Sequence, residues 1–291
     1  MKQLERYWIM IVFLWVMPVD GLLSQPVSVS QEEGALQADT LDEGPKPMGY
    51  LEQAGVEYQF HFFREPWVRR WHVNSLRTDW RIKGSPVQAK INAGRLAGPE
   101  EGDGQLFHLQ YQVDAYPRIS SSDYMYLSAA FSGSTRFPKY YLGGEWYHSF
   151  ARGFEASLGF RWFQWRESVV YYTGSAGKYY GNYWFSLRAY VTPTEDYTGQ
   201  TWVLSARRYL ATAEDYLGLK LEYGTSPENL ISIVDYPNIK GFRSAGAHLS
   251  YQRRLGQWLM RTEAGYRREE YREDTFRNHL SIQLHLLYQF N

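Results

Sequence analysis

The sequence contains no cysteine and no excess of charge of either sign. Among its 291 residues, 31 are Lys or Arg and 31 are Asp or Glu, so the formal net charge is zero. The missing thiols exclude disulfides, zinc–thiolate sites, iron–sulfur clusters and a cysteine nucleophile. A balanced charge provides no overall positive field for a polyanion, which argues against nucleic acid as the main partner.

Long apolar segments are also scarce. The clearest one, Tyr7–Val19, has thirteen residues, whereas a transmembrane helix needs about 20. It follows a positively charged N-terminus and precedes Ser24, a small residue followed by a polar one, which is the layout of a secretory signal peptide. We therefore expect a signal peptide at residues 1–24, with an uncleaved membrane anchor as the alternative. Residues 25–48 are acidic and almost free of aromatics, which predicts a flexible lead-in.

Aromatic residues, in contrast, are abundant and make up 18% of the chain. From about residue 50 onward, apolar and polar residues alternate, as in Phe107–Ala115 and Leu280–Phe290. A period of two residues predicts β-strands, because successive side chains of a strand point to opposite faces. No helical stretch interrupts these runs, so a parallel α/β fold is excluded.

We count fourteen alternating runs, and the less regular ones among them would reduce the number to twelve. The runs are 54–63, 71–82, 86–96, 105–116, 123–131, 139–149, 153–166, 168–178, 182–192, 200–209, 215–225, 241–254, 257–268 and 276–290.

Three features indicate that the apolar face of these runs contacts lipid. Many of the runs reach the length of a tilted membrane-crossing strand, about 9–11 residues, whereas strands of soluble sheets have about 5–6. The polar face is too charged for a closed core. The connections alternate between short and long, as in barrels with short periplasmic turns and longer outer loops. The connection near Glu167 breaks this rule, which predicts either a tight hairpin or a wrong strand count.

We therefore predict an all-β fold, an antiparallel transmembrane β-barrel of 12–14 strands with a best count of 14, over residues 49–291. Both termini are expected in the periplasm. The aromatic residues Tyr288 and Phe290 near the end of the last run fit the C-terminal strand of an outer-membrane barrel. A soluble, secreted β-sandwich is the alternative, although it does not explain the alternating connections.

Charged residues on the polar face form the candidate functional set. We expect them to line the lumen, with arginines paired to glutamates more as a structural network than as a determinant of ion preference. The set is Glu155, Arg161, Arg188, Arg207, Lys220, Glu222, His248, Arg261 and Glu263.

One pair of residues in this region suggests an enzyme as an alternative. His248 and Ser250 lie two apart on one predicted strand, with Glu263 on the next, and outer-membrane phospholipases use such a His-x-Ser pair. In those enzymes the pair faces lipid, whereas here Leu249 takes the lipid-facing position. No hydrolase, P-loop or dinucleotide motif is present. We expect no catalytic, cofactor-binding or metal-binding residues.

Several segments carry a specific resemblance. They are Tyr116-Pro-Arg118, Arg136-Phe-Pro138, Gly153–Arg161, Tyr172–Arg188, Arg207-Arg-Tyr209, Tyr216–Leu219 and Tyr223–Pro227. Through them, the chain from about Gly49 onward resembles the YaiO family of outer-membrane β-barrel proteins. The resemblance implies a Gram-negative outer membrane and a barrel domain, and it implies no catalytic residues.

The function expected from these observations is passive. The protein would be a small pore, or a structural accessory in envelope assembly or surface-polysaccharide export. Its expected partners are outer-membrane lipid and either a small solute or a surface polysaccharide, and the sequence identifies no protein partner.

Overall fold

The computed structural model describes residues 49–64, 69–97, 107–165, 168–193, 198–225, 243–272 and 274–290. The predicted signal peptide (1–24) and acidic lead-in (25–48) lie outside these residues. Within the described ranges, no helix is long and apolar enough to span a membrane.

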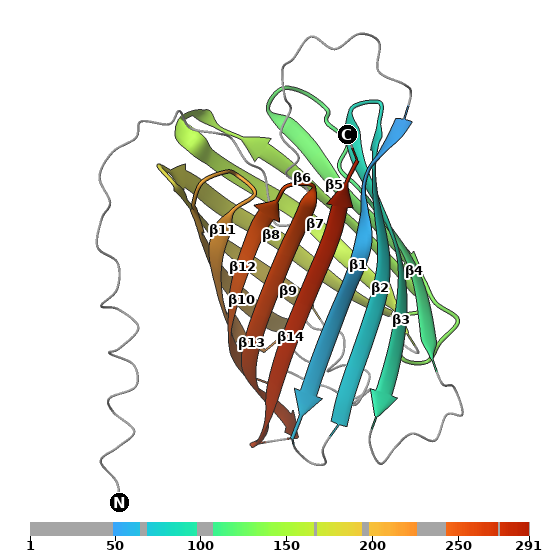
Figure 1. Ribbon diagram of the computed structural model, residues 1–291. Helices are drawn as coiled ribbons and strands as arrows, with labels where there is room; N and C mark the ends of the chain where they lie inside the picture. The colour runs from blue at the N-terminus through green and yellow to red at the C-terminus, as the bar shows by residue number, and fades with distance from the viewer. Residues whose placement is uncertain are drawn as a thin grey trace, which may run out of the picture.

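Fourteen antiparallel strands account for almost all of the described chain (Figure 1). They are β1 Gly49–Phe63, β2 Arg69–Ile82, β3 Ser85–Ala97, β4 His108–Ala115, β5 Asp123–Phe131, β6 Tyr140–Ser149, β7 Phe154–Gln164, β8 Ser168–Tyr180, β9 Tyr183–Pro193, β10 Thr198–Tyr209, β11 Tyr216–Gly224, β12 Ser244–Leu255, β13 Trp258–Arg272 and β14 Thr275–Gln289. A single turn of 3₁₀ helix, Ala151–Gly153, lies between β6 and β7.

The strands form one closed barrel. Each pairs with its neighbours in sequence, and β14 pairs with β1 from Gln53↔Gln289 to Phe63↔His279. In Figure 1 these two strands, red and blue, run side by side. Closure leaves no unpaired sheet edge. The predicted barrel and its best count of fourteen strands are confirmed, and the alternative of a two-sheet sandwich is wrong.

Strand boundaries follow the alternating pattern closely. The largest difference is in β1, which begins at Gly49 rather than at residue 54, because an irregularity between Leu51 and Gln53 extends its pairing with β2. The short connection after β7 is a tight hairpin, since Gln164 pairs with Ser168.

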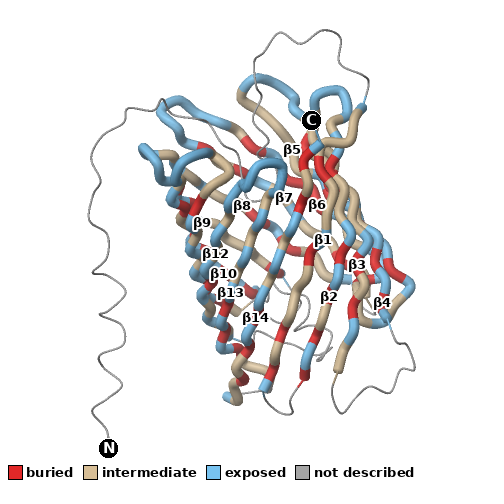
Figure 2. The backbone as a smooth tube through the Cα atoms, in the orientation of Figure 1, coloured by how far each residue is buried: buried red, intermediate tan, exposed pale blue. Residues whose placement is uncertain are grey.

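Buried and exposed residues alternate along the strands of the wall (Figure 2). The exposed residues are often apolar and the buried ones mostly polar, the reverse of a soluble protein. On β12, Leu249 is 65% exposed, whereas the adjacent His248 is 9% exposed. Val56, Leu204 and Ile282 are likewise exposed, whereas the buried side chains are mostly polar. An outward apolar face and an inward polar face are the arrangement of a barrel in lipid.

The described chain begins and ends at the same end of the barrel. Gly49 pairs with Ile82 beside the two-residue turn Lys83-Gly84, and the backbone N–H of Phe290 donates to the carbonyl of Glu52. Both turn residues have positive φ, 49° and 79°, as expected for the commonest class of tight hairpin. We call this the short-turn end and the opposite one the loop end.

Candidate functional site

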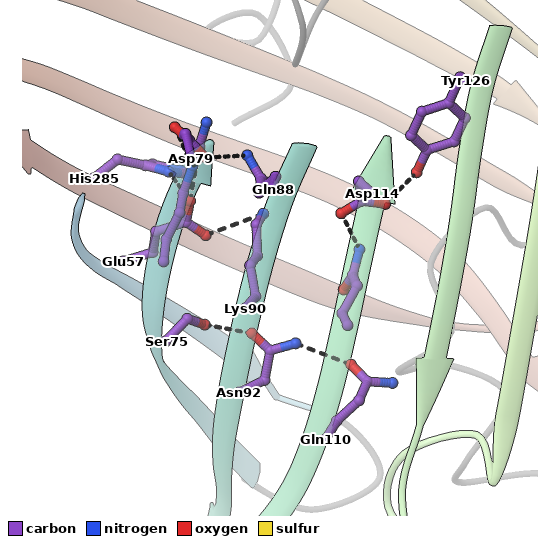
Figure 3. Close-up of polar contacts among 12 residues, drawn as sticks. Glu57, Ser75, Asp79, Gln88, Lys90, Asn92, Gln110, Asp114, Tyr126 and His285 are labelled. Carbon is purple, nitrogen blue, oxygen red and sulfur yellow. Dashed lines mark hydrogen bonds and ion pairs between the residues drawn. The ribbon is translucent and has the colours of Figure 1, made fainter. Parts of the chain in front are cut away.

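The interior of the barrel contains clusters of paired charges, and the first surrounds Glu57 on β1 (Figure 3). Its carboxylate accepts from Arg77 Nη1 at 2.9 Å and lies 3.4 Å from Lys90 Nζ and 3.1 Å from His285 Nδ1. Arg77 also donates to Asp79 at 2.9 Å. One buried carboxylate therefore receives side chains from β2, β3 and β14, which joins the two strands that close the barrel.

Hydrogen bonds between neighbouring strands lie beside this cluster on the wall (Figure 3). Ser75 donates to Asn92 at 2.6 Å, and Asn92 donates to Gln110 at 3.0 Å, so these two bonds join β2, β3 and β4. Separately, Asp114 on β4 accepts from the hydroxyl of Tyr126 on β5 at 2.9 Å. Buried polar groups of this kind are stable because each finds a partner on a neighbouring strand.

A second cluster centres on Glu145 of β6, whose side chain is 0% exposed. It accepts from Arg161 Nη2 at 2.8 Å and from Arg188 Nη1 at 2.7 Å. Arg188 lies on β9, three strands away. It can reach because the intervening strands carry small inward residues such as Ser157 and Thr173, which themselves donate to Glu145 and accept from Arg188, respectively.

A third cluster occupies β11 to β13. Arg267 donates to Glu222, and His248 lies between two carboxylates, with Nε2 3.6 Å from Glu222 and Nδ1 3.3 Å from Glu263. Arg261 donates to Glu263 at 2.9 Å. The alternation of acidic and basic groups neutralises the buried charges.

Glycines make room for this third cluster. A Cβ at Gly246 would lie 2.6 Å from Glu222 Oε1, and one at Gly265 would lie 2.3 Å from His248 Nδ1. Both distances are well inside normal contact, so any larger residue would displace the charged side chains. The absence of a side chain at these positions is therefore part of the site.

The remaining members of the predicted set have other surroundings. Glu155 is buried and accepts from the hydroxyl of Tyr124 at 3.2 Å. The Arg207 guanidinium lies 4.9 Å from the ring centroid of Trp184 and 4.8 Å from that of Tyr216, which is cation–π geometry. Lys220 on β11 is half-buried.

The predicted pairing of arginines and glutamates needs correction in its partners. Arg161 and Arg188 both pair with Glu145, a residue outside the predicted set, and Glu222 pairs with Arg267. Glu145 occupies an inward position of an alternating run, so it could have been included on that signal. That Arg188 is its partner could not have been predicted, because spacing in the sequence does not show which side chains of different strands come close together.

Side chains also narrow the interior at its loop end. Phe63, Trp71 and Val73 form a buried apolar cluster, against which Phe137 of the connection between β5 and β6 packs. The rings of Trp71 and Phe137 lie 5.6 Å apart, edge to face. The connection therefore folds inward across part of this opening, and Phe137 belongs to one of the segments noted in the sequence.

The short-turn end has a comparable inward contact. Glu214, in the connection between β10 and β11, accepts from Gln289 Nε2 at 3.1 Å and from Arg254 Nη1 at 2.7 Å. Gln289 lies on β14, three strands from β11, so this connection lies over the edge of the opening.

No group of three or more potential metal ligands occurs in the described ranges. His248 contacts carboxylates on the inner face of the wall, whereas the neighbouring Leu249 points outward. The pair that suggested a lipid-modifying enzyme therefore does not lie on the apolar outer face.

A model of the YaiO membrane beta barrel domain matches residues 51–229. The chain belongs to this family. This YaiO-family barrel is an outer-membrane protein of a Gram-negative bacterium, as the resemblance implied. Comparison with curated proteins found no match.

Solved structures with a similar fold include several outer-membrane proteins. An anion-selective porin from Comamonas acidovorans is 9% identical with a TM-score of 0.45, over 83% of this chain and 100% of the porin. OprD from Pseudomonas aeruginosa is 9% identical with a TM-score of 0.44, over 83% and 95%. OprB from Pseudomonas putida is 10% identical with a TM-score of 0.47, over 83% and 94%.

Proposed function

We propose that this protein is a passive, non-enzymatic pore for small polar solutes, with its short-turn end facing the periplasm. The observation that carries the proposal is the direction of the ion pairs around Glu57, Glu145 and Glu222. They join strands that are one to three apart, so each pair links neighbouring parts of the wall and none of these pairs joins opposite walls. A fourteen-stranded barrel also encloses more space than the side chains of its inner face fill, whereas eight strands are just filled.

In this proposal the inner charges have two roles. Their pairing holds the wall in shape, and their uncompensated remainder sets the preference for ions. These inner charges comprise Glu57 and Glu145 together with the set predicted from the sequence: Glu155, Arg161, Arg188, Arg207, Lys220, Glu222, His248, Arg261 and Glu263.

Conductance of the purified full-length protein in a planar bilayer tests the pore. We expect discrete, ohmic steps. Truncation of Phe137 to Ala should enlarge the steps, because this ring narrows the loop end, whereas Phe131→Ala, on the outer face of the adjoining strand, should leave them unchanged. A correctly folded barrel that never conducts would overturn the pore.

A structural accessory in envelope assembly or surface-polysaccharide export is the second candidate. It is favoured by the inward connections at both ends, which carry Phe137 and Glu214. If the wild-type barrel is silent and the variants Phe137→Ala and Glu214→Ala together open it, the accessory role replaces the pore.

The absence of enzymatic activity and the orientation need separate tests. Vesicles of phosphatidylethanolamine incubated with the protein should release no fatty acid, and release that His248→Ala abolishes would contradict a passive barrel. An epitope inserted at Gly133, in a loop-end connection, should be reached by antibody on whole cells, and one inserted at Gly84 should not. The reverse pattern would invert the proposed orientation.

A further inference from the structure

The outer face of the barrel is not uniformly convex. A cavity of about 840 Å³ lies against β2 to β7, and outward side chains supply most of its lining. The register of the strands arranges these side chains in two rows. One row is bulky and consists of Leu76, Ile91, Tyr111, Phe131 and Tyr140.

The second row forms the floor of this outer trough. It runs through Thr78, Ala89, Val113 and Ala129 to Leu142. Three of these five side chains are small, so the floor lies lower than the bulky row beside it. An empty trough would leave its lining without contact atoms on one side, which forfeits dispersion energy. The trough therefore favours a flexible apolar occupant that follows its course.

The trough also slopes along the barrel. Leu76 lies seven residues into β2, near the middle of the strand, whereas Tyr140 is the first residue of β6, at the loop end. The rows connect these two residues, so the trough rises from the centre of the apolar belt to its rim. This is the path of an acyl chain that enters from a head group at the loop end.

Basic side chains lie at the upper end of this path. Lys139 precedes Tyr140, and its ammonium lies 5.5 Å from the centroid of that ring. Arg95 and Arg70 are exposed near the loop ends of β3 and β2. Neither arginine forms an ion pair with a carboxylate of the residues described. Both are exposed on the outer face, so neither neutralises a carboxylate of the inner face.

Strand geometry places these cations at a common height. Arg95 lies four residues from Ile91, about 13 Å along β3, while Tyr140 lies three strands across from Ile91, about 14 Å. Because the strands are tilted by roughly 40°, each displacement brings the residue about 10 Å nearer the loop end than Ile91, measured along the barrel axis. Lys139 and Arg95 therefore lie at about the same level above the trough, roughly 19 Å apart along the rim.

We propose that the trough binds an acyl chain of an anionic, phosphate-bearing lipid whose head group contacts Lys139, while Arg95 adds positive charge to the same rim. Cationic side chains at the membrane surface attract anionic head groups, and the trough below them supplies complementary apolar surface. The lipid site is independent of the proposed pore, since its residues face away from the lumen, and either can fail without the other.

Photolabelling of the full-length protein in vesicles tests this site. The vesicles contain phosphatidylcholine and a small fraction of phosphatidylglycerol that carries a photoreactive group on its acyl chain. Adducts should concentrate at least fivefold on β3 to β6 relative to β10 to β12, and the same probe on phosphatidylcholine should show less than half of this enrichment. Even labelling around the barrel would overturn the site.

Two pairs of variants separate the chain from the head group. Ala129→Phe fills the floor and should reduce the enrichment to the level of the rest of the barrel, whereas Ala247→Phe, an outward residue on β12, should not. The double variant Lys139→Gln with Arg95→Gln should abolish the difference between the two lipids, whereas Arg208→Gln, at the short-turn end, should retain it.

Fold and oligomeric state are read on the same samples. Unboiled and boiled protein should migrate at different apparent masses for every variant, which shows that the barrel is folded. If Ala129→Phe fails this test, the smaller substitution Ala129→Leu takes its place. Adducts between two protein chains in place of lipid adducts on β3 to β6 would identify a second copy as the occupant and overturn the lipid.

Discussion

The inner and outer faces of the barrel wall are stabilised in different ways. On the inner face, Glu145 is fully buried and depends on two arginines from other strands. On the outer face, Leu204 is 48% exposed, and it depends on surrounding lipid rather than on particular neighbours. Inner residues are therefore coupled to one another, whereas outer residues need only be apolar. Substitutions on the two faces should differ in size and in cause.

The largest effect is expected on the inner face at Glu145. Glu145→Gln leaves Arg161 and Arg188 without their carboxylate, which should cost about 3–5 kcal/mol in the free energy of unfolding. Asp274→Asn is the control, because the side chains of Asp274 and its partner Arg243 are 84% and 50% exposed and such surface pairs contribute about 0–1 kcal/mol. Reversible urea unfolding in vesicles measures both, and equal losses would contradict the coupling of the inner face.

A charge on the outer face should cost slightly less, and its cost should depend on depth. Leu204→Arg, in the middle of β10, is expected to destabilise the barrel by about 2–4 kcal/mol. Gln200→Arg lies four residues nearer the loop end on the same face and should cost about 0–1 kcal/mol. If both substitutions were harmless, the outer face would not lie in lipid.

The glycines behind the inner charges provide a third test. Gly246→Ala places a Cβ 2.6 Å from Glu222 Oε1, so the ion pair with Arg267 must shift, at a cost of about 1–3 kcal/mol. Gly133→Ala, whose Cβ would meet nothing within 4 Å, should change the free energy of unfolding by less than about 0.5 kcal/mol. If Gly246→Ala left the free energy of unfolding unchanged, the third cluster would not be tightly packed against this glycine.

The smallest effect concerns ion preference. Arg188→Gln removes one inner positive charge, so the reversal potential in a salt gradient should shift toward cation preference. Arg208→Gln removes an outward charge at the short-turn end and should leave the reversal potential unchanged. A shift in the opposite direction for Arg188→Gln would exclude this residue from the path of the ions.

Alternation in the sequence was sufficient for much of the fold because it is a local property. Leu249 and His248 differ in exposure as their positions in the pattern predict, and the short connection after β7 is the tight hairpin that was one of two alternatives. The bulge in β1 was not predicted, because an extra residue in a strand breaks the alternation on which the prediction depends.

The sequence alone established that this chain forms strands with one apolar and one polar face, because each strand shows its two faces in its own residues. The length of the runs, their charged polar face and the alternating connections then predicted a barrel of 12–14 strands with its apolar side outward. Only the tertiary structure decided which charges meet. Arg188 reaches Glu145 across two strands of small residues, and Tyr140 lines up with Leu76 across four strand boundaries. Both depend on register and curvature, which arise from contacts between residues far apart in the chain.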